Sequence, residues 1–396
     1  MDAETAGNRV GAFEDAAPMA QDRTLGWQYY TSRGDVFDVD GHWYLTSAEA
    51  VRFALQHPDV FSSARAFDAL GSPVPLIPLA IDRPDHVRYR RLLDPMLAPR
   101  VIAALKEDLR RQLNGLIDGF AERGHCELIT ELATPYPSQV IMTLFGLPLE
   151  DRDKFLEWNR LILEAQERRD SEPTPEQAAG GLALFEYLAA FIDAKREHPA
   201  DDLISSILTL EGDDEWTPEE LLGLCFLFVL AGLDTVAGAI GFTMLELARN
   251  PELRNRVAAD TSLIAPVVEE VLRLELPAPV VPRVTTADVE VAGALIPAGA
   301  HCSILLAAAN RDERERGGSP DEVDLEHADL GHLSFGGGIH RCLGSHLARA
   351  ELYLVVEEFL RRIPDFQLAE GFTPEIVWPS GTHHLASLPL EWGTAR

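Results

Sequence analysis

The sequence predicts a mainly α-helical protein with small β-sheets, which is an α+β fold. Helical periodicity dominates from Pro84 to about residue 250, whereas strand-like segments lie near residues 36–45 and again after residue 277. With 396 residues, length alone would allow about two or three domains.

The N-terminal segments should form an arm followed by a hairpin. Residues 1–25 are acidic and small, and we expect them to form a flexible N-terminal arm. Residues 36–45 read as two short strands around Asp40-Gly41, a turn pair typical of hairpins.

A capped helix and a long loop are expected next. Thr46 or Ser47 caps a helix that runs towards His57. Residues 59–84 are rich in Pro, Gly and Ala, and long loops of this kind are commonly functional. Prolines then interrupt the helical periodicity at Pro135, Pro148, Pro173 and Pro199. Later strands are expected around Arg283, at residues 289–291 and at residues 301–306.

The longest predicted helix begins at Thr217-Pro218-Glu219-Glu220, a capping box with proline at the first helical position. It has no strong stop before Asn250, so about 32 residues should span roughly 48 Å. Between Leu221 and Phe242 its only charged side chain is Asp234, so a membrane span is a competing interpretation. A charge at mid-span is costly and no basic flank orients a span, so we interpret the helix as the centre of a large soluble protein.

A glycine run near the C-terminus brings one cysteine to the start of another helical segment. Residues 334–344 read Ser-Phe-Gly-Gly-Gly-Ile-His-Arg-Cys-Leu-Gly. A helix that begins after Cys342 would direct the N–H groups of Leu343 and Gly344 at the sulfur and stabilise a thiolate, which is a good iron ligand. The glycines remove side chains that would hold a flat macrocycle away from the backbone.

Other interpretations of this loop stay open. A lone cysteine is usually a small buried hydrophobe, and a glycine loop before a helix can hold phosphate. No Gly-Lys-Ser/Thr ending or dinucleotide fingerprint supports phosphate binding. A zinc site is disfavoured because the four cysteines form no CxxC pair: Cys126, Cys225, Cys302 and Cys342.

The loop resembles the haem-thiolate loop of the cytochrome P-450 superfamily, whose pattern is Phe, any two, Gly, any, His or Arg, any, Cys, any, Gly. Five residues fill the fixed positions: Phe335, Gly338, His340, Cys342 and Gly344. The resemblance implies that Cys342 is the metal ligand of heme b, iron protoporphyrin IX, and that Phe335, Gly336 and Gly344 lie against this cofactor. Gly337 stands where a soluble bacterial member carries a bulkier residue, and we expect no loss of ligation from it.

A block of small and polar residues interrupts the apolar central helix: Ala231-Gly232-Leu233-Asp234-Thr235. Thr235 can donate to the carbonyl of Ala231, which loosens the helix and opens a polar notch. On its own the block could be only a buried polar kink. It is similar to the oxygen-activation motif of the same superfamily, which implies that Asp234 and Thr235 are catalytic and that Ala231 lies beside the cofactor. Thr235 would hydrogen-bond the bound dioxygen, and Asp234 would relay protons.

Further charged residues match other positions of the family. Glu270 and Arg273 stand at i and i+3, a spacing that usually gives a solvated salt bridge, and in the family this ExxR element is structural. Propionates are carboxylates and need charged partners when buried. The resemblance assigns them to His86, Arg90, Arg283 and His340.

The resemblance covers residues 25–392 and implies one triangular domain over residues 26–396, with the long central helix over the haem. It implies a monooxygenase that inserts one atom of dioxygen into a small hydrophobic substrate by hydroxylation or epoxidation. The family's substrate contacts correspond to Phe67, Leu70, Val74, Leu76, Leu79, Leu230, Leu233, Val280, Val281 and Thr382. Because nearly all of them are apolar, we expect a terpenoid, steroid, fatty acyl or aromatic substrate.

Charge and composition limit the partners. The formal net charge of -30 repels phosphate backbones and anionic membrane surfaces, so neither nucleic acid nor a membrane is expected. The first 25 residues lack a signal pattern and the cysteines are widely spaced, so we expect a cytoplasmic protein. A monomer is expected.

Electrons should come from a separate protein, because no flavin or nicotinamide fingerprint is present. We expect an iron-sulfur ferredoxin with its NAD(P)H-dependent reductase. The basic docking patch would consist of Arg88, Arg91, Arg341 and Arg349.

Two other functions stay open. A family member could use peroxide or catalyse dehydration or isomerisation, although the intact Asp234-Thr235 pair disfavours this. A non-catalytic haem-binding sensor would need neither an apolar pocket nor a proton relay.

Overall fold

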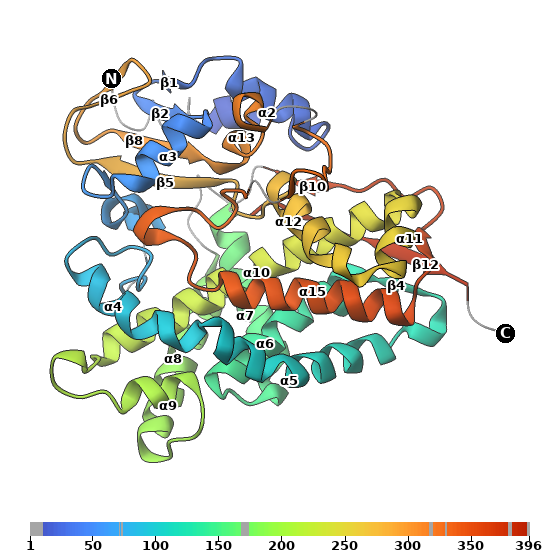
Figure 1. Ribbon diagram of the computed structural model, residues 1–396. Helices are drawn as coiled ribbons and strands as arrows, with labels where there is room; N and C mark the ends of the chain where they lie inside the picture. The colour runs from blue at the N-terminus through green and yellow to red at the C-terminus, as the bar shows by residue number, and fades with distance from the viewer. Residues whose placement is uncertain are drawn as a thin grey trace.

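The computed structural model describes residues 11–70, 72, 74–167, 174–316, 320–328, 331–378 and 382–393, without the side chains of residues 68–70, 163–167 and 213. Helices predominate and the strands form small sheets, which confirms the predicted α+β class (Figure 1).

The helices are α2 (Arg23–Thr31), α3 (Ala48–Gln56), α4 (Asp85–Leu93), α5 (Pro99–Asp118), α6 (Pro135–Phe145), α7 (Arg152–Glu167), α8 (Pro175–Glu197), α9 (Leu203–Leu208), α10 (Pro218–Arg249), α11 (Pro251–Ala259), α12 (Ile264–Leu274), α13 (Leu306–Ala309), α14 (Glu313–Arg316) and α15 (Ser345–Arg362). The strands are β1 (Val36–Val39), β2 (His42–Leu45), β3 (Phe61–Ser62), β4 (His125–Glu127), β5 (Val280–Thr285), β6 (Val289–Val291), β7 (Ala294–Ile296), β8 (His301–Leu305), β9 (Phe366–Leu368), β10 (Ile376–Val377), β11 (His384–Leu385) and β12 (Pro389–Trp392).

The central helix α10 has the predicted start and end. The N–H of Glu220 donates to Oγ1 of Thr217 at 3.2 Å, and the N–H of Thr217 donates to the Glu220 carboxylate at 2.7 Å. Helices α6, α8, α12 and α15 pack around α10 (Figure 1). By length and composition α10 could cross a membrane, but 61% of its apolar window is buried inside the protein. This burial is what a core helix of a globular protein requires.

A five-stranded sheet forms the second part of the molecule, with the strand order β1-β2-β8-β5-β3. Strands β2 and β8 pair in parallel, and the other neighbours pair antiparallel. The predicted hairpin is present, with Val39 opposite His42. Ser47 caps α3 by accepting a hydrogen bond from the N–H of Ala50. Helices α2, α3 and α13 lie beside this sheet and close its core (Figure 1).

Three further sheets are small. Their strand orders are β4-β12-β9, β10-β11 and β6-β7. Strands β9 to β12 were not expected from the sequence, because segments of two to four residues show too little alternation.

Two expected segments differ from the structure. The loop expected over residues 59–84 contains β3 and a 3₁₀ helix, Ala64–Leu70, and the Asp82 carboxylate accepts a hydrogen bond from the N–H of Ser63 at 2.9 Å. The described part of the expected N-terminal arm is packed, because Met19 has no exposed surface and its sulfur lies against Gly26. Pro135 begins α6 and Pro199 separates α8 from α9, as expected, whereas Pro173 lies outside the described residues.

Candidate active site

The middle of α10 presents an open face in an otherwise buried helix. Ala231 is exposed and Thr235 is partly buried, whereas the neighbouring helical turns are enclosed by protein. Oγ1 of Thr235 donates to the carbonyl oxygen of Ala231 at 2.7 Å, as the sequence predicted. The exposed Ala231 therefore gives this face of α10 accessible surface in the middle of the helix.

Asp234 is held by a residue that the sequence did not indicate. Nδ2 of Asn159 in α7 donates to Oδ1 of Asp234 at 3.1 Å, and Asn159 is only 4% exposed. The buried amide fixes the direction of the Asp234 carboxylate and brings no opposite charge to it. The 75-residue separation explains why no local pattern revealed the pair.

The Cys342 residue has solvent-accessible surface, but protein atoms surround its thiol on most sides. Burial raises the pKa of this thiol, while the N–H of Gly344 and the charges of Arg90, Arg341 and Arg349 act in the opposite direction. The N–H of Gly344 therefore points at the sulfur as expected, and α15 begins one residue later. A positively charged metal at the sulfur would shift this balance towards the thiolate.

The glycines of the loop permit close backbone contacts. Gly336 and Gly338 have φ values of 66° and 63°, a region that favours glycine. A Cβ on Gly338 would lie 1.9 Å from the carbonyl oxygen of Leu55 in α3, so no other residue fits here. The N–H of Cys342 donates to the carbonyl oxygen of Phe335 at 2.8 Å and closes the loop.

Three of the four expected propionate ligands lie in one buried cluster. The rings of His86 and His340 are 4.5 Å apart, and the Nε2 atoms of both are buried without a hydrogen-bond partner among the described residues. Burial lowers the pKa of His340 to about 3, and Arg283 and His86 lower it further. Burial also lowers the pKa of Arg283 to about 10. Arg90 lies near this cluster as well, because its charge lowers the pKa of both imidazoles. It also donates to the carbonyl oxygen of Arg341 at 2.8 Å and pairs with Asp94 at 2.8 Å.

These residues fit a haem group. Two buried imidazoles without partners and a buried guanidinium, which forms no ion pair within the described part of the chain, suit carboxylates that are removed from water. The accessible Cys342 thiol, a group that can ligate iron, lies in the same loop as His340. The chemistry of the donor set therefore matches the cofactor that the sequence implied.

The Glu270–Arg273 pair is buried, not solvated. The two side chains are 2% and 1% exposed, and Nη2 of Arg273 lies 2.8 Å from Oε2 of Glu270. Arg273 also donates to the carbonyl oxygens of Pro320 and Glu322. The pair thus ties α12 to the segment that precedes the cysteine loop, which is a structural role.

Most of the expected substrate-contact residues are neither fully buried nor fully exposed, as pocket walls are. Partly buried members are Phe67, Val74, Leu79, Leu230, Val280, Val281 and Thr382. Leu76 is buried in the core, and the side chain of Leu70 lies outside the described residues. Leu233 is also buried, and it stands two positions after Ala231, about 200° around the helix. Leu233 therefore faces away from Ala231 and Thr235.

The expected basic patch is largely paired. Arg88 pairs with Glu220 at 2.8 Å, Arg91 pairs with Asp214, and Arg349 pairs with Glu269 at 2.7 Å. Arg341 is exposed beside Cys342.

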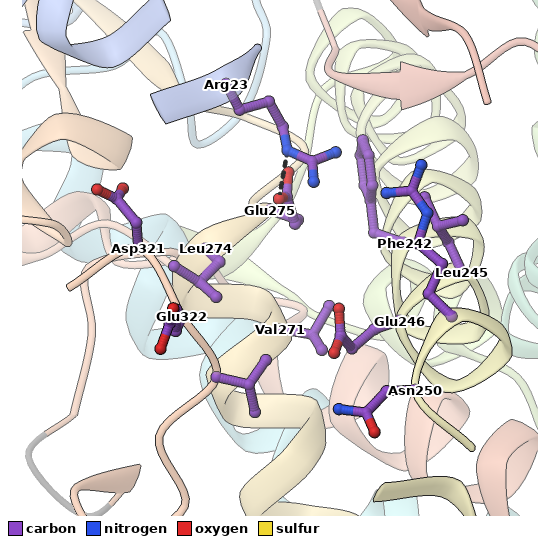
Figure 2. A pocket seen from close by; sticks show the side chains of 12 residues that line it. Arg23, Phe242, Leu245, Glu246, Asn250, Val271, Leu274, Glu275, Asp321 and Glu322 are labelled. Carbon is purple, nitrogen blue, oxygen red and sulfur yellow. Dashed lines mark ion pairs between the residues drawn. The ribbon is translucent and has the colours of Figure 1, made fainter. Parts of the chain in front are cut away.

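A cavity of about 360 Å³ lies away from this face, between α2, the end of α10, α12 and residues 321–323. Figure 2 shows Arg23 and Glu275 at one end of it and Asn250 at the other. Arg23 and Glu275 pair at 2.6 Å. Glu246 in its wall is 11 positions after Thr235, about 16 Å along the helix, so this polar cavity is separate from the Ala231 face.

Comparisons with known proteins agree with this geometry. Residues 183–369 match the family model "Cytochrome P450". The chain is 34% identical to a vitamin D(3) 25-hydroxylase of Pseudonocardia autotrophica, covering 89% of this chain and 88% of that protein. It is 31% identical to a methyl-branched lipid omega-hydroxylase of Mycobacterium bovis, covering 89% and 84%. The crystal structure of the myxobacterial cytochrome P450 CYP267B1 in complex with myristic acid matches with a TM-score of 0.85 and 30% identity, over 96% of this chain and 98% of that one.

Proposed function

Because the chain belongs to the cytochrome P450 family and is a monooxygenase of that family, we propose that it hydroxylates or epoxidises a small hydrophobic molecule with electrons from an iron-sulfur ferredoxin. The observation that carries this proposal is the open face at Ala231 and Thr235 in the otherwise buried helix α10. This face offers the hydroxyl of Thr235, and the carboxylate of Asp234 lies next to it in the sequence, held by Asn159 of α7.

The cofactor that suits the site is heme b, which would be held by Cys342 and, at its propionates, by His86, Arg90, Arg283 and His340. When bound, it supplies the activation of dioxygen. The thiol must lose its proton to ligate iron, and Gly344 and the nearby arginines favour that loss.

The residues of α10 hold and move protons. The hydroxyl of Thr235 donates to the carbonyl of Ala231, and a small rotation would direct its proton into the space beside Ala231. Asp234, oriented by Asn159, stands next to Thr235 and would pass protons to it. Apolar side chains beside these groups would limit the access of water, so Asp234 and Thr235 would supply the protons.

The substrate class is inferred from the residues that are expected to form the substrate pocket. Val74, Leu79, Leu230, Val280 and Val281 offer apolar surface, and a pocket with few polar groups selects molecules with few polar handles. The named relatives act on vitamin D(3) and on a methyl-branched lipid, and one structural neighbour holds myristic acid. We therefore favour a fatty acyl or steroid substrate over a terpenoid or a small aromatic one.

The proposed partner is a ferredoxin with its NAD(P)H-dependent reductase, in the cytoplasm, acting on a monomer of this protein. Arg341 is exposed beside Cys342 and offers a positive contact close to the cofactor site. Arg88, Arg91 and Arg349 contribute less net charge, because each has a carboxylate partner.

Titration of the ferric protein with fatty acids, steroids and terpenes tests this proposal. A substrate should displace water and shift the Soret band towards the high-spin form, with saturation in the micromolar range. Product should then require ferredoxin, reductase and dioxygen. Cys342→Ser serves as the control and should lose the red-shifted band of the ferrous carbon monoxide complex. Turnover with peroxide alone, or the absence of any spin shift across the panel, would contradict the proposal.

A further inference from the structure

Glu269 in α12 connects three separate segments of the chain. Its carboxylate accepts hydrogen bonds from Nε and Nη2 of Arg349, both at 2.7 Å, and from the hydroxyl of Tyr353 at 2.8 Å. Both donors lie on α15, the helix that follows Cys342. Nε2 of His332, at the start of the cysteine loop, lies 3.0 Å from the same carboxylate.

Arg349 in turn lies on the aromatic ring of the cysteine loop. Its guanidinium carbon is 4.3 Å from the centroid of the Phe335 ring. The bidentate bond to Glu269 fixes the plane of the guanidinium, because the two nitrogens must face the two carboxylate oxygens. Phe335 accepts the backbone hydrogen bond from Cys342, so the ring and the iron-binding residue belong to one closed loop.

The contacts of Glu269 favour its ionised form. Burial alone would raise the pKa of Glu269, but the bonds from His332, Arg349 and Tyr353 hold it well below its usual range. The carboxylate therefore carries its charge at neutral pH and balances the cation of Arg349. The side chains of Glu269 and Arg349 are 19% and 22% exposed, so water screens this pair only in part.

Glu269 and the next residue on α12 have different roles. Glu270 bonds Arg273 within the same helix and fixes the segment before the cysteine loop. Glu269 instead reaches α15 and the loop itself. The number of partners indicates a specific role for Glu269. A glutamate that only kept the surface soluble, or only joined two helices, would need no more than one partner.

We propose that Glu269 is a positioning residue for the haem site, which holds Arg349 on Phe335 and keeps the cation of Arg349 balanced beside the Cys342 thiolate. The connection restrains the loop on the side that faces the cofactor. It also sets how much positive charge the iron ligand experiences, and so the equilibrium between the ferric and ferrous states. This role needs haem binding only, so a wrong substrate or electron donor in the proposed function would leave it intact.

The test compares Glu269→Gln, Arg349→Gln and the double variant, all loaded with haem. Glu269→Gln should favour the ferrous state about tenfold, a shift of about 59 mV for one electron, because the cation of Arg349 is no longer balanced. Arg349→Gln should shift the equilibrium in the opposite direction. Each single variant should lose haem to apomyoglobin about tenfold faster, and the double variant no faster than either, because both changes break one connection.

Glu252→Gln is the matched control, since it removes one charge from an exposed position on α11. It should leave the potential and the haem-loss rate unchanged. A Glu269→Gln variant with a lower melting temperature but an unchanged potential would overturn the proposal and show a purely structural role. The proposal would also be overturned if the increase in haem-loss rate in the double variant equalled the product of the two single increases. Such a result would show that Glu269 and Arg349 act through two independent contacts. If Glu269→Gln fails to fold, the direction in which Arg349→Gln shifts the equilibrium between the ferric and ferrous states still tests the proposal.

Discussion

Thr235 donates its hydroxyl proton to the carbonyl oxygen of Ala231 at 2.7 Å, one turn earlier in the same helix. This bond adds a side-chain donor to a carbonyl of the continuous helix α10 and places the hydroxyl beside the exposed face at Ala231. The proton is thus kept by a weak local partner that a bound molecule can replace.

We predict that Thr235→Ala uncouples electron consumption from product formation. Without the hydroxyl, the site loses its positioned proton donor, and product per NADH should fall on the order of tenfold while hydrogen peroxide appears. Thr243→Ala is the matched control, because Thr243 makes the same 2.7 Å bond to Ala239 two turns later but is buried in the core. Equal coupling in both variants would contradict the role of Thr235.

Asn159→Leu should slow proton delivery without loss of haem. The change removes the donor at 3.1 Å from Asp234, and a hydrogen bond to a charged group contributes about 1.5–3 kcal/mol. Turnover should fall roughly tenfold, and the solvent hydrogen isotope effect should rise. Asn159→Asp should be slower still above neutral pH, because two carboxylates would then repel. An isotope effect equal to that of the unchanged protein would show that Asn159 only fills space.

The sequence predicted the contacts that lie within one element. The Thr235–Ala231 bond and the Glu270–Arg273 pair join residues three or four positions apart, where helix geometry alone brings them together. Burial of the second pair was not predictable, because it depends on the segment around Pro320 that covers it.

Contacts between distant segments were not predictable from local patterns. Arg349 was assigned to a solvent-exposed docking patch because its charge was all that the sequence showed. In the structure it faces Glu269 on α12, 80 positions earlier in the chain. The sequence predicts Leu233 in the substrate pocket together with its neighbours. In the structure, its position around the helix directs the side chain into the core. Such differences arise where tertiary packing decides which face of an element is used.

The free energy of unfolding of the haem-free protein should fall with acid because of His340. The pKa of this imidazole is about 3 in the folded state, against about 6.5 when unfolded. Between these pH values the unfolded chain binds more protons at this site, so stability rises with pH by at most about 1.4 kcal/mol per unit. Going from pH 7.5 to 5.5, the unchanged protein should lose more stability than His340→Gln, measured by urea unfolding.

The control for this pH effect is His301→Gln, which alters an exposed histidine on β8. Its unfolding curves show how far the loss of a surface histidine changes the pH dependence. Binding of haem should reduce the difference between the His340 variant and the unchanged protein, because a propionate near the ring raises the imidazole's pKa. Parallel pH curves for His340→Gln and the unchanged haem-free protein would contradict the assignment.

Gly338→Ala should prevent haem binding, whereas Gly337→Ala should not. The added Cβ at Gly338 would lie 1.9 Å from the carbonyl oxygen of Leu55, and the φ of 63° costs a further 1–2 kcal/mol, roughly, for any residue with a side chain. The loop must then move away from α3 and carry Cys342 with it. At Gly337 the backbone is extended, and the nearest atom is Cδ1 of Leu55 at 3.3 Å, which can rotate aside. The ferrous carbon monoxide spectrum per amount of protein measures the outcome, and equal spectra for the two variants would show that the contact between α3 and the loop does not hold the cysteine in place.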